Sequence, residues 1–265
     1  MNRPALSVRK LTVKVREKGG LTAIVDSIDF DLGEGEVLAI VGESGSGKSK
    51  TAEAIMGLVA YKTGTVSADA MLLGETDLAG LSNAEMQKVR GRDISMVFQE
   101  PLTALDPVFS CGQQLTTIYR RHRGQSRRES LVSARQMLSR VGFPDPDRVM
   151  QSYPHRLSGG MRQRVLIAMA MACRPRVLIA DEPTTALDVT TQASVLSRLL
   201  SLGRENGTAI LLITHDLGIV AHYCDRALVM REGRIVEQAT VRELFDNPAH
   251  EYTRALLSAS REMNP

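Results

Sequence analysis

The chain has 265 residues, of which 43% are hydrophobic, and its formal net charge is +3 at pH 7. This length fits one large domain, or one domain with an inserted lobe, and the apolar content is ample for a core. So small a net charge gives no general argument for nucleic-acid binding. The longest apolar run, at Val165–Cys173, falls well short of the roughly 18 residues of a membrane helix, and it predicts a buried helix.

Neither the first residues nor the cysteines indicate an exported protein. Residues 1–10, MNRPALSVRK, lack the apolar segment of a signal peptide, so we expect the protein to be made and kept in the cytosol. Cys111, Cys173 and Cys224 are far apart and lack C-x-x-C spacing. We therefore expect free thiols, not a disulfide framework or a metal cluster.

In chain order, the first half predicts strands followed by helices. Residues 1–35 alternate in polarity and predict an antiparallel sheet, and residues 36–57 predict a strand, a loop and a helix. A further strand is expected at 94–99. Residues of about 100–165 are helix-like with glycine and proline breakers, which predicts an inserted helical lobe.

The second half predicts a parallel sheet. Apolar strands are expected at 176–181 and 208–214, and the helix at 192–202 between them gives the alternation that parallel sheets need. Residues 226–238 predict a hairpin that turns at Glu232 and Gly233. The end of the chain predicts a helix, a proline break and a second short helix.

A glycine-rich segment, GESGSGKSK, follows the first buried strand and matches the G-x-x-x-x-G-K-S pattern of a phosphate-binding loop. Its glycines let backbone N–H groups approach phosphate oxygens, and a helix that begins near Lys48 adds its positive dipole end. Lys48 supplies charge to the outer phosphates and Ser49 a hydroxyl for Mg²⁺. A plain glycine-rich turn is the simpler alternative. The predicted nucleotide contacts are Gly42, Glu43, Ser44, Gly45, Ser46, Gly47, Lys48, Ser49 and Lys50.

Three polar positions follow other predicted strands, at the strand ends where open α/β sheets bind ligands. Asp181 is predicted to hold Mg²⁺ through water, and Glu182 to polarise the attacking water. His215 is predicted to hydrogen-bond a γ-phosphate and to relay its presence to Asp216. The simpler interpretations are an exposed acidic pair that caps the next helix, and a histidine without a catalytic role.

Gln99 and the segment LSGGMRQR complete the set of candidate residues. The amide of Gln99 is predicted to reach both metal and water, so the expected metal ligands are Ser49, Gln99 and Asp181, and the expected catalytic residues are Glu182, His215 and Gln99. In LSGGM, Ser158 is predicted to cap a helix while its glycines offer N–H donors to phosphate. The predicted contacts there are Leu157, Ser158, Gly159, Gly160 and Met161.

In this order the motifs resemble those of the ATP-binding cassette (ABC) ATPases. The matching segments are a Walker A loop at 42–49, a Q-loop at Gln99, the signature at 157–161, Walker B at 177–182, a D-loop at 186–188 and a switch His215. The resemblance implies one ABC ATPase domain over 1–265. Its expected fold is an α/β P-loop NTPase core with an N-terminal antiparallel β subdomain, an inserted helical subdomain at about 100–165 and a C-terminal tail at about 232–265. It also implies a head-to-tail dimer with two shared ATP sites, where the signature reaches the γ-phosphate bound by the opposite subunit.

Three segments are similar to a narrower group, the oligopeptide, dipeptide and nickel import ATPases. They are FQEPLTALDP at 98–107, LSGGMRQR with Met161 replacing the usual Gln, and NPAHEYTRALL near the end, where the group commonly has His-Pro-Tyr-Thr. This resemblance implies a subunit that couples hydrolysis of ATP, with Mg²⁺, to uptake of a peptide, nickel or a metal chelate. It further implies a peripheral location at the cytoplasmic face of the membrane. The implied partners are a second ATPase subunit, identical or different, two membrane permease subunits and, indirectly, an extracytoplasmic substrate-binding protein.

Other interpretations stay open at this level. A soluble ABC-type ATPase of DNA repair, translation or cluster assembly is the main alternative, although repair and translation members usually carry a coiled-coil insertion or tandem cassettes. An inactive cassette is disfavoured by the complete motif set. The arginine-rich stretch Tyr119–Arg128 is interpreted as a solvated helix end, or as a contact for anionic lipid or an acidic partner. RNA binding is disfavoured because no aromatic platform is interleaved beyond Tyr119.

Val15 occupies the place in the first strand region where the family usually stacks adenine on an aromatic ring. We predict that Val15→Tyr tightens ATP binding by roughly 0.5–1.5 kcal/mol, because a ring supplies the missing stacking surface. Titration calorimetry of the parent and the variant measures this difference. Unchanged or weaker affinity would mean that other residues hold the adenine.

Overall fold

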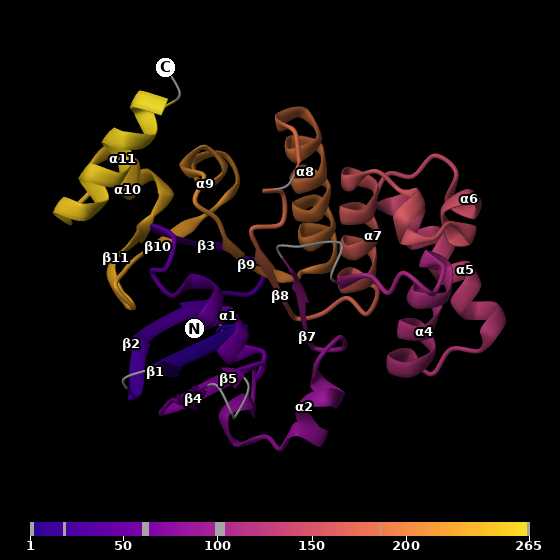
Figure 1. Ribbon diagram of the computed structural model, residues 1–265, viewed down its shortest axis with the longest axis horizontal. Helices are drawn as coiled ribbons and strands as arrows, with labels where there is room; N and C mark the ends of the chain where they lie inside the picture. Colours follow the sequence, from indigo (N-terminus) through magenta and orange to yellow (C-terminus); the bar gives the residue numbers. More distant parts are fainter. Residues whose placement is uncertain (1–2, 18–19, 60–63, 99–103, 186, 264–265) are drawn as a thin grey trace. The chain divides into compact units, whose positions relative to one another are not determined.

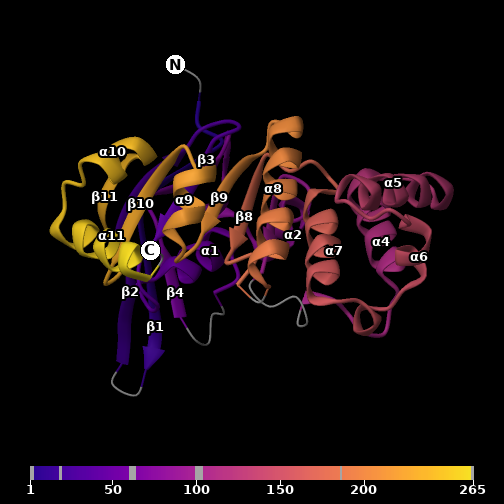
Figure 2. The same ribbon diagram turned by 90° about the horizontal axis from the view of Figure 1, so that it is seen from above.

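The computed structural model describes residues 3–17, 20–59, 64–98, 104–185 and 187–263 (Figure 1). The chain forms two units, of which the first combines Met1–Gln87 with Ala209–Pro265 and the second is Lys88–Thr208. The first unit therefore contains both ends of the chain, and the second is inserted into it. In Figures 1 and 2 the first unit holds most of the strands and the second most of the long helices.

An antiparallel sheet forms the N-terminal part of the first unit, as predicted. Its strands are β1 (Leu6–Glu17), β2 (Gly20–Leu32), β4 (Gly64–Ser67), β5 (Ala70–Leu73) and β6 (Thr76–Asp77). Their order is β2-β1-β5-β6, and β4 also pairs with β1. Leu6 and Val8 of β1 are fully buried and so are Leu11 and Val13, because alternate side chains of a strand point to the same face and a register shift between Val8 and Leu11 moves the buried series by one residue.

The first unit also carries a parallel set of strands. These are β3 (Val37–Val41), β9 (Ala209–Ile213), β10 (Arg226–Arg231) and β11 (Arg234–Thr240). β3 is parallel to both β9 and β10, and β11 closes an antiparallel hairpin with β10. The hairpin turns at Glu232 and Gly233, as predicted, and both residues have positive φ. Every residue of β3 and β9 is buried, as expected of parallel strands covered on both faces.

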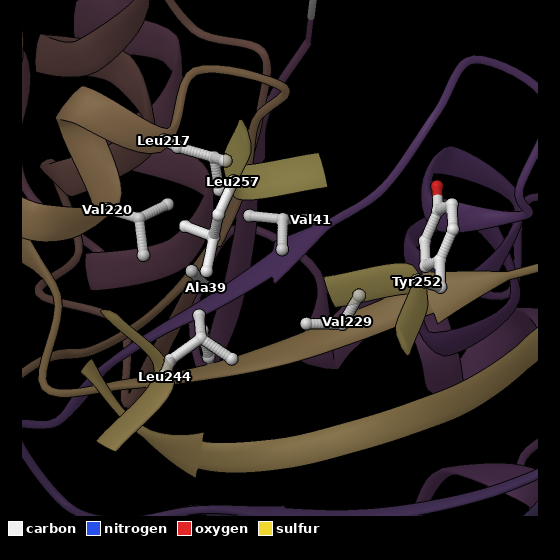
Figure 3. Packing of buried hydrophobic residues seen from close by; sticks show 9 residues of the cluster. Ala39, Val41, Leu217, Val220, Val229, Leu244, Tyr252 and Leu257 are labelled. Atoms are coloured by element: carbon white, nitrogen blue, oxygen red, sulfur yellow. The ribbon is translucent and has the colours of Figure 1, made fainter. Parts of the chain in front are cut away.

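Helices pack on these strands through an apolar cluster shown in Figure 3. The helices of this unit begin with α1 (Lys48–Ile55) and the turn η1 (Leu78–Gly80), with α2 (Asn83–Val89) at its boundary, and continue with α9 (Leu217–Tyr223), α10 (Val241–Asp246) and α11 (Glu251–Met263). The cluster joins strand residues such as Ala39 and Val229 to Leu217 of α9, Leu244 of α10 and Leu257 of α11. Burying an aliphatic side chain of this size is worth about 1.5–3 kcal/mol, so the cluster fixes the C-terminal helices on the sheet.

The second unit consists mainly of helices with two parallel strands. The strands are β7 (Ile94–Val97) and β8 (Val177–Asp181). The helices are α4 (Cys111–Arg123), α5 (Arg127–Arg140), α6 (Pro146–Gln151), the turn η2 (Pro154–Arg156), α7 (Gly159–Met171) and α8 (Val189–Asn206). α4 packs against α5, α6 and α7, and α7 packs against α8 and β7. α8 is longer than the predicted 192–202, because Asp188 caps it one turn earlier and Gly207 ends it.

The arginine-rich stretch forms the end of α4 and the start of α5. Arg120, Arg121 and Arg123 lie in the last turn of α4, where cations interact favourably with the negative end of the helix dipole, and Arg127 and Arg128 begin α5. Tyr119 is only 3% exposed and belongs to the core. Ser126 starts α5 with a capping box to Glu129. The stretch thus forms a helix end with exposed arginines, and a contact of these arginines with anionic lipid or an acidic partner stays a prediction.

Candidate functional site

The predicted phosphate-binding loop lies at the carboxyl end of β3, directly before α1. Gly47 caps α1 with φ of 105°, a left-handed conformation that favours glycine. A Cβ on Gly47 would lie 2.7 Å from the carbonyl oxygen of Ile24 and 2.9 Å from Cε of Met230. The loop therefore packs directly on β2 and β10, and a side chain at this position has no room.

The β10–β11 turn holds the loop from a second side. The backbone N–H of Gly233 donates to the carbonyl oxygen of Ser46 at 3.0 Å, and the Asp26 N–H donates to the Gly233 carbonyl at 2.8 Å. One residue of the turn thus connects the loop to β2. Arg234 and Asp26 add an exposed ion pair at 2.6 Å beside this connection.

Lys48 lies over the backbone of the loop. Its side chain is buried, and its Nζ donates to the carbonyl oxygens of Gly42 at 2.9 Å and Glu43 at 2.8 Å. The Oγ of Ser46 is also buried, and within the described residues it has no hydrogen-bond partner. A buried hydroxyl without a partner costs free energy that an oxygen-rich ligand would recover. These features fit a polyphosphate. Ser49 is half-buried in the first turn of α1, and its role as a Mg²⁺ ligand stays a prediction.

The same loop borders a hollow of about 550 Å³. Glu43, Ser44, Gly45 and Ser46 line one side of it, and residues of the β10–β11 turn and α11 line the other. Tyr252 of α11 is among them, and its Oη accepts a hydrogen bond from the backbone N–H of Glu43 at 3.2 Å. Sequence reasoning gave Tyr252 no role at the loop. No local signal could have done so, since the two residues are 209 positions apart.

His215 follows β9 on the strand next to β3. The N–H of Thr214 donates to the Ile40 carbonyl at 3.2 Å, which fixes the end of β9 beside the end of β3. Asp216 then caps α9 by accepting from the N–H groups of Gly218 and Ile219. The exposed His215 is thus held between a strand end and a capped helix, in the same unit as the loop.

In the second unit, the predicted acidic pair follows β8. Asp181 is 6% exposed and Glu182 is half-buried. Glu182 has φ of 45°, in the left-handed region that costs a non-glycine residue free energy and is found disproportionately at functional sites. Its Oε2 accepts from the Thr185 hydroxyl at 3.0 Å. The neighbouring strand β7 ends at Val97, two residues before the predicted end, and Gln99 lies outside the described residues.

The LSGG segment begins α7, as predicted. Ser158 is the N-cap, and its Oγ accepts from the Met161 N–H at 3.3 Å. A Cβ on Gly160 would lie 2.5 Å from Cγ2 of Thr191, so this first turn packs closely on α8. Leu157 is buried beneath it. The N–H groups of this turn form a site suited to an anion.

Asp188, in the predicted D-loop, caps α8. The carboxylate accepts from the N–H of Thr191 at 3.0 Å and the hydroxyl of Thr190 at 2.7 Å. These hydrogen bonds, the backbone one first, lower the pKa of Asp188 to about 2. The group therefore stays ionised throughout the physiological range. Ala186 of the same motif lies outside the described residues.

Three further predicted features concern metals, adenine and the cysteines. Within the described residues, no cluster of three or more His, Cys, Asp or Glu side chains could hold a metal. Mg²⁺ usually takes one or two protein ligands and completes its shell with phosphate and water, which agrees with the few ligands predicted here.

Val15, the residue predicted at the adenine position, is half-buried in β1 and pairs with Thr22 of β2 and Gly64 of β4. The three cysteines are free thiols.

The family model with the description "ABC transporter" matches residues 25–185 of this chain. The chain belongs to the ABC transporter family. It is 49% identical over 259 residues to the glutathione import ATP-binding protein GsiA of Escherichia coli strain K12, and equally to GsiA of Shigella flexneri. Each match covers 96% of this chain but only 42% of GsiA. The chain thus spans less than half the length of these relatives.

Solved structures agree with this assignment. The ATP-binding cassette MJ0796, in a dimeric post-hydrolysis state bound to ADP and Pi, is 26% identical with a TM-score of 0.79, over 89% of this chain and 99% of that one. CbiO1 from Clostridium perfringens, part of the ABC transporter complex cbiONQ, is 27% identical with a TM-score of 0.74, over 99% of this chain and 98% of that one. The predicted ABC ATPase fold, with its P-loop core, N-terminal antiparallel sheet and helical insertion, is confirmed. In the part of the chain that the structure describes, no helix is long and apolar enough to cross a membrane.

Close packing at Gly47 leads to a prediction for the loop. Gly47→Ala should lower the free energy of unfolding by about 1–3 kcal/mol, because the new methyl group meets the Ile24 carbonyl in a left-handed conformation. A loop displaced by this collision should bind ATP about tenfold more weakly or worse, since each 1.4 kcal/mol is a factor of ten. Urea denaturation and titration calorimetry measure the two effects.

Gly80→Ala is the matched control, because a Cβ on Gly80 meets no atom within 4 Å. It should change neither quantity measurably. An alanine at Gly47 that bound ATP like the parent would show that the loop tolerates movement away from β2, and the prediction would then be wrong.

Proposed function

We propose that the protein is the ATP-hydrolysing subunit of an ABC importer. The observation that carries this proposal is the loop at the end of β3, where Lys48 lies over the loop carbonyls and the buried Ser46 hydroxyl lacks a partner within the described residues. Family membership adds support, because the chain has the ordered set of motifs that such ATPases use. The dimeric MJ0796 cassette, bound to ADP and Pi, supports a dimer of ATPase subunits as the active form.

In the proposed reaction, the loop and Lys48 bind the phosphates of ATP, and Glu182 accepts a proton from the water that attacks the γ-phosphorus, with ADP as the leaving group. His215 contacts the γ-phosphate. The signature turn at Ser158 binds the γ-phosphate held by the opposite subunit. Mg²⁺ would be held by Ser49, Asp181 and Gln99 and would neutralise developing charge on the phosphates.

The remaining parts of the proposal concern transport. The partners are a second ATPase subunit, two permease subunits and, indirectly, a substrate-binding protein, and the location is the cytoplasmic face of the membrane. Among peptide, nickel and metal-chelate cargoes, a peptide is favoured, because GsiA is named for import of glutathione, a small peptide. The helical subdomain at about 100–165 would receive the permease, and the tail at about 232–265 completes the ATPase domain.

The segment proposed to receive the permease contains the apolar residues Leu102, Leu105, Val108 and Phe109, and those that the structure describes differ in their exposure to solvent. Leu105 is 2% exposed and belongs to the core, while Val108 and Phe109 are 72% and 49% exposed. Leu102 lies outside the described residues. Phe109 borders a hollow of about 560 Å³ next to α4, α5 and α6. An exposed aromatic ring beside a hollow suits a docking surface, since burial of that ring on binding is favourable.

The catalytic part is tested at Glu182 and Lys48. Glu182→Gln should retain ATP binding and dimer formation but lose turnover by at least about a hundredfold, because an amide cannot accept the proton of the attacking water. Lys48→Ala should instead weaken ATP binding itself. Calorimetry measures ATP binding, size-exclusion chromatography in the presence of ATP measures dimer formation, and phosphate release measures turnover. Hydrolysis at the parental rate by Glu182→Gln would remove its assigned role.

The transport part is tested at Phe109. Phe109→Glu should leave the isolated subunit folded, since surface substitutions usually change stability by less than about 0.5 kcal/mol. It should abolish both copurification with the permease and cargo uptake. Val132→Glu, a similarly exposed position at 47% on α5, is the control and should do neither. A Phe109→Glu protein that still joined its permease and imported cargo would contradict the docking assignment, and a parent never found with membranes would favour a soluble ATPase.

A further inference from the structure

The first turn of α11 contacts the phosphate-binding loop, although the two segments are far apart in the chain. The Oη of Tyr252 accepts a hydrogen bond from the backbone N–H of Glu43 at 3.2 Å. In Figure 3 the Tyr252 ring lies at the edge of the apolar cluster, and its hydroxyl is the group that contacts Glu43. The aromatic body is therefore anchored in the core while the polar end reaches the loop.

The ring itself is tightly held. Tyr252 is 8% exposed, and the guanidinium of Arg231 lies 4.9 Å from the ring centroid, a distance at which a cation is attracted to an aromatic face. Burial is the main cause that raises the pKa of Tyr252 above its ordinary value. The hydroxyl is accordingly neutral at physiological pH and fixed in direction by its ring.

The start of α11 is fixed in turn by Glu237 of β11. The two carboxylate oxygens accept from the N–H groups of Ala249 at 2.8 Å and His250 at 2.9 Å. Burial acts to raise the pKa of Glu237, but hydrogen bonds that include these two outweigh it, and the pKa is lowered. Nδ1 of His250 then accepts from the Tyr252 N–H at 3.1 Å. A chain of contacts thus leads from β11 to the tyrosine ring.

On the loop side, the Glu43 backbone is held at both of its polar groups. Its carbonyl oxygen accepts from Nζ of Lys48 at 2.8 Å and from the Ser46 N–H at 3.2 Å, while its N–H donates to Tyr252. If the N–H contact were lost, the backbone at Glu43 could rotate. The Gly42 carbonyl belongs to the same peptide group as this N–H and also accepts from Nζ of Lys48, so it would move with the N–H.

We propose that Tyr252 is a positioning residue of the phosphate-binding loop, which fixes the backbone at Glu43 and thereby sets the affinity of the loop for nucleotide. This inference rests on the proposed ATP-binding function and extends it to the C-terminal helix. Tyr252 touches the loop and acts through it. It has no part in the chemical step, so nucleotide affinity depends on it and the rate at saturating ATP does not.

The test compares three variants of the full chain. Tyr252→Phe removes the hydroxyl but keeps the ring, Tyr252→Leu removes both, and Tyr223→Phe removes a tyrosine hydroxyl of α9 as a control. For each, hydrogen exchange at the Glu43 amide is measured by NMR without nucleotide. The dissociation constant for ATP, and KM and kcat for hydrolysis, are measured alongside.

For Tyr252→Phe we expect faster hydrogen exchange at the Glu43 amide. The dissociation constant for ATP and the KM should each rise about fivefold, as loss of one hydrogen bond implies. The kcat should stay within about twofold of the parent. Tyr223→Phe should match the parent throughout. Parental exchange and affinity in Tyr252→Phe would overturn the proposal, and if only Tyr252→Leu were impaired, the residue would serve packing alone. A parent chain that failed to bind ATP would instead overturn the proposed function, and with it this role.

Discussion

The packing of Gly47 against the carbonyl of Ile24 is the constraint on which the nucleotide-binding half of the structure depends. It brings the phosphate-binding loop onto β2 and β10 with no space for a side chain, so the loop cannot be displaced without moving two strands. The β10–β11 turn then becomes a structural part of the loop, because Gly233 donates to Ser46 and accepts from Asp26. Contacts with strands of two different sheets therefore hold this short glycine-rich segment in place.

This arrangement explains why the C-terminal end of the chain belongs to the same unit as the loop. α10 and α11 pack on β3 and β10 through a common apolar cluster that includes Leu244 and Leu257 (Figure 3). Once α11 is packed there, Tyr252 is already placed beside Glu43. The tail thus contributes to the loop's geometry as well as to the core.

In the second unit, the predicted site residues are positioned by backbone conformation and helix capping. Glu182 is held in a left-handed backbone conformation directly after the buried strand β8, and Ser158 begins α7 with its side chain satisfying the first turn. Strain at Glu182 is maintained by the rigid strand before it and by the contact from Thr185. Gly160 is required by close packing on Thr191, so the position of the first turn of α7 depends on where α8 lies. The packing of α7 on α8 therefore sets the position of the signature turn.

The sequence by itself determined most of the element types and the two sheet classes, and it predicts the residues of the nucleotide-binding motifs, because these depend on local periodicity and on glycine, capping and strand-end patterns. It predicted the strand before the loop of Lys48, the strand that ends at Asp181 and the strand before His215, and the hairpin at Glu232 and Gly233. Three features were decided only by the tertiary structure. Burial of Leu105 and exposure of Phe109 depend on the helices packed around them. The left-handed backbone conformation of Glu182 depends on the strand and turn that hold it. The contact of Tyr252 with Glu43 joins residues 209 positions apart, and only the folded core brings such residues within reach of one hydrogen bond.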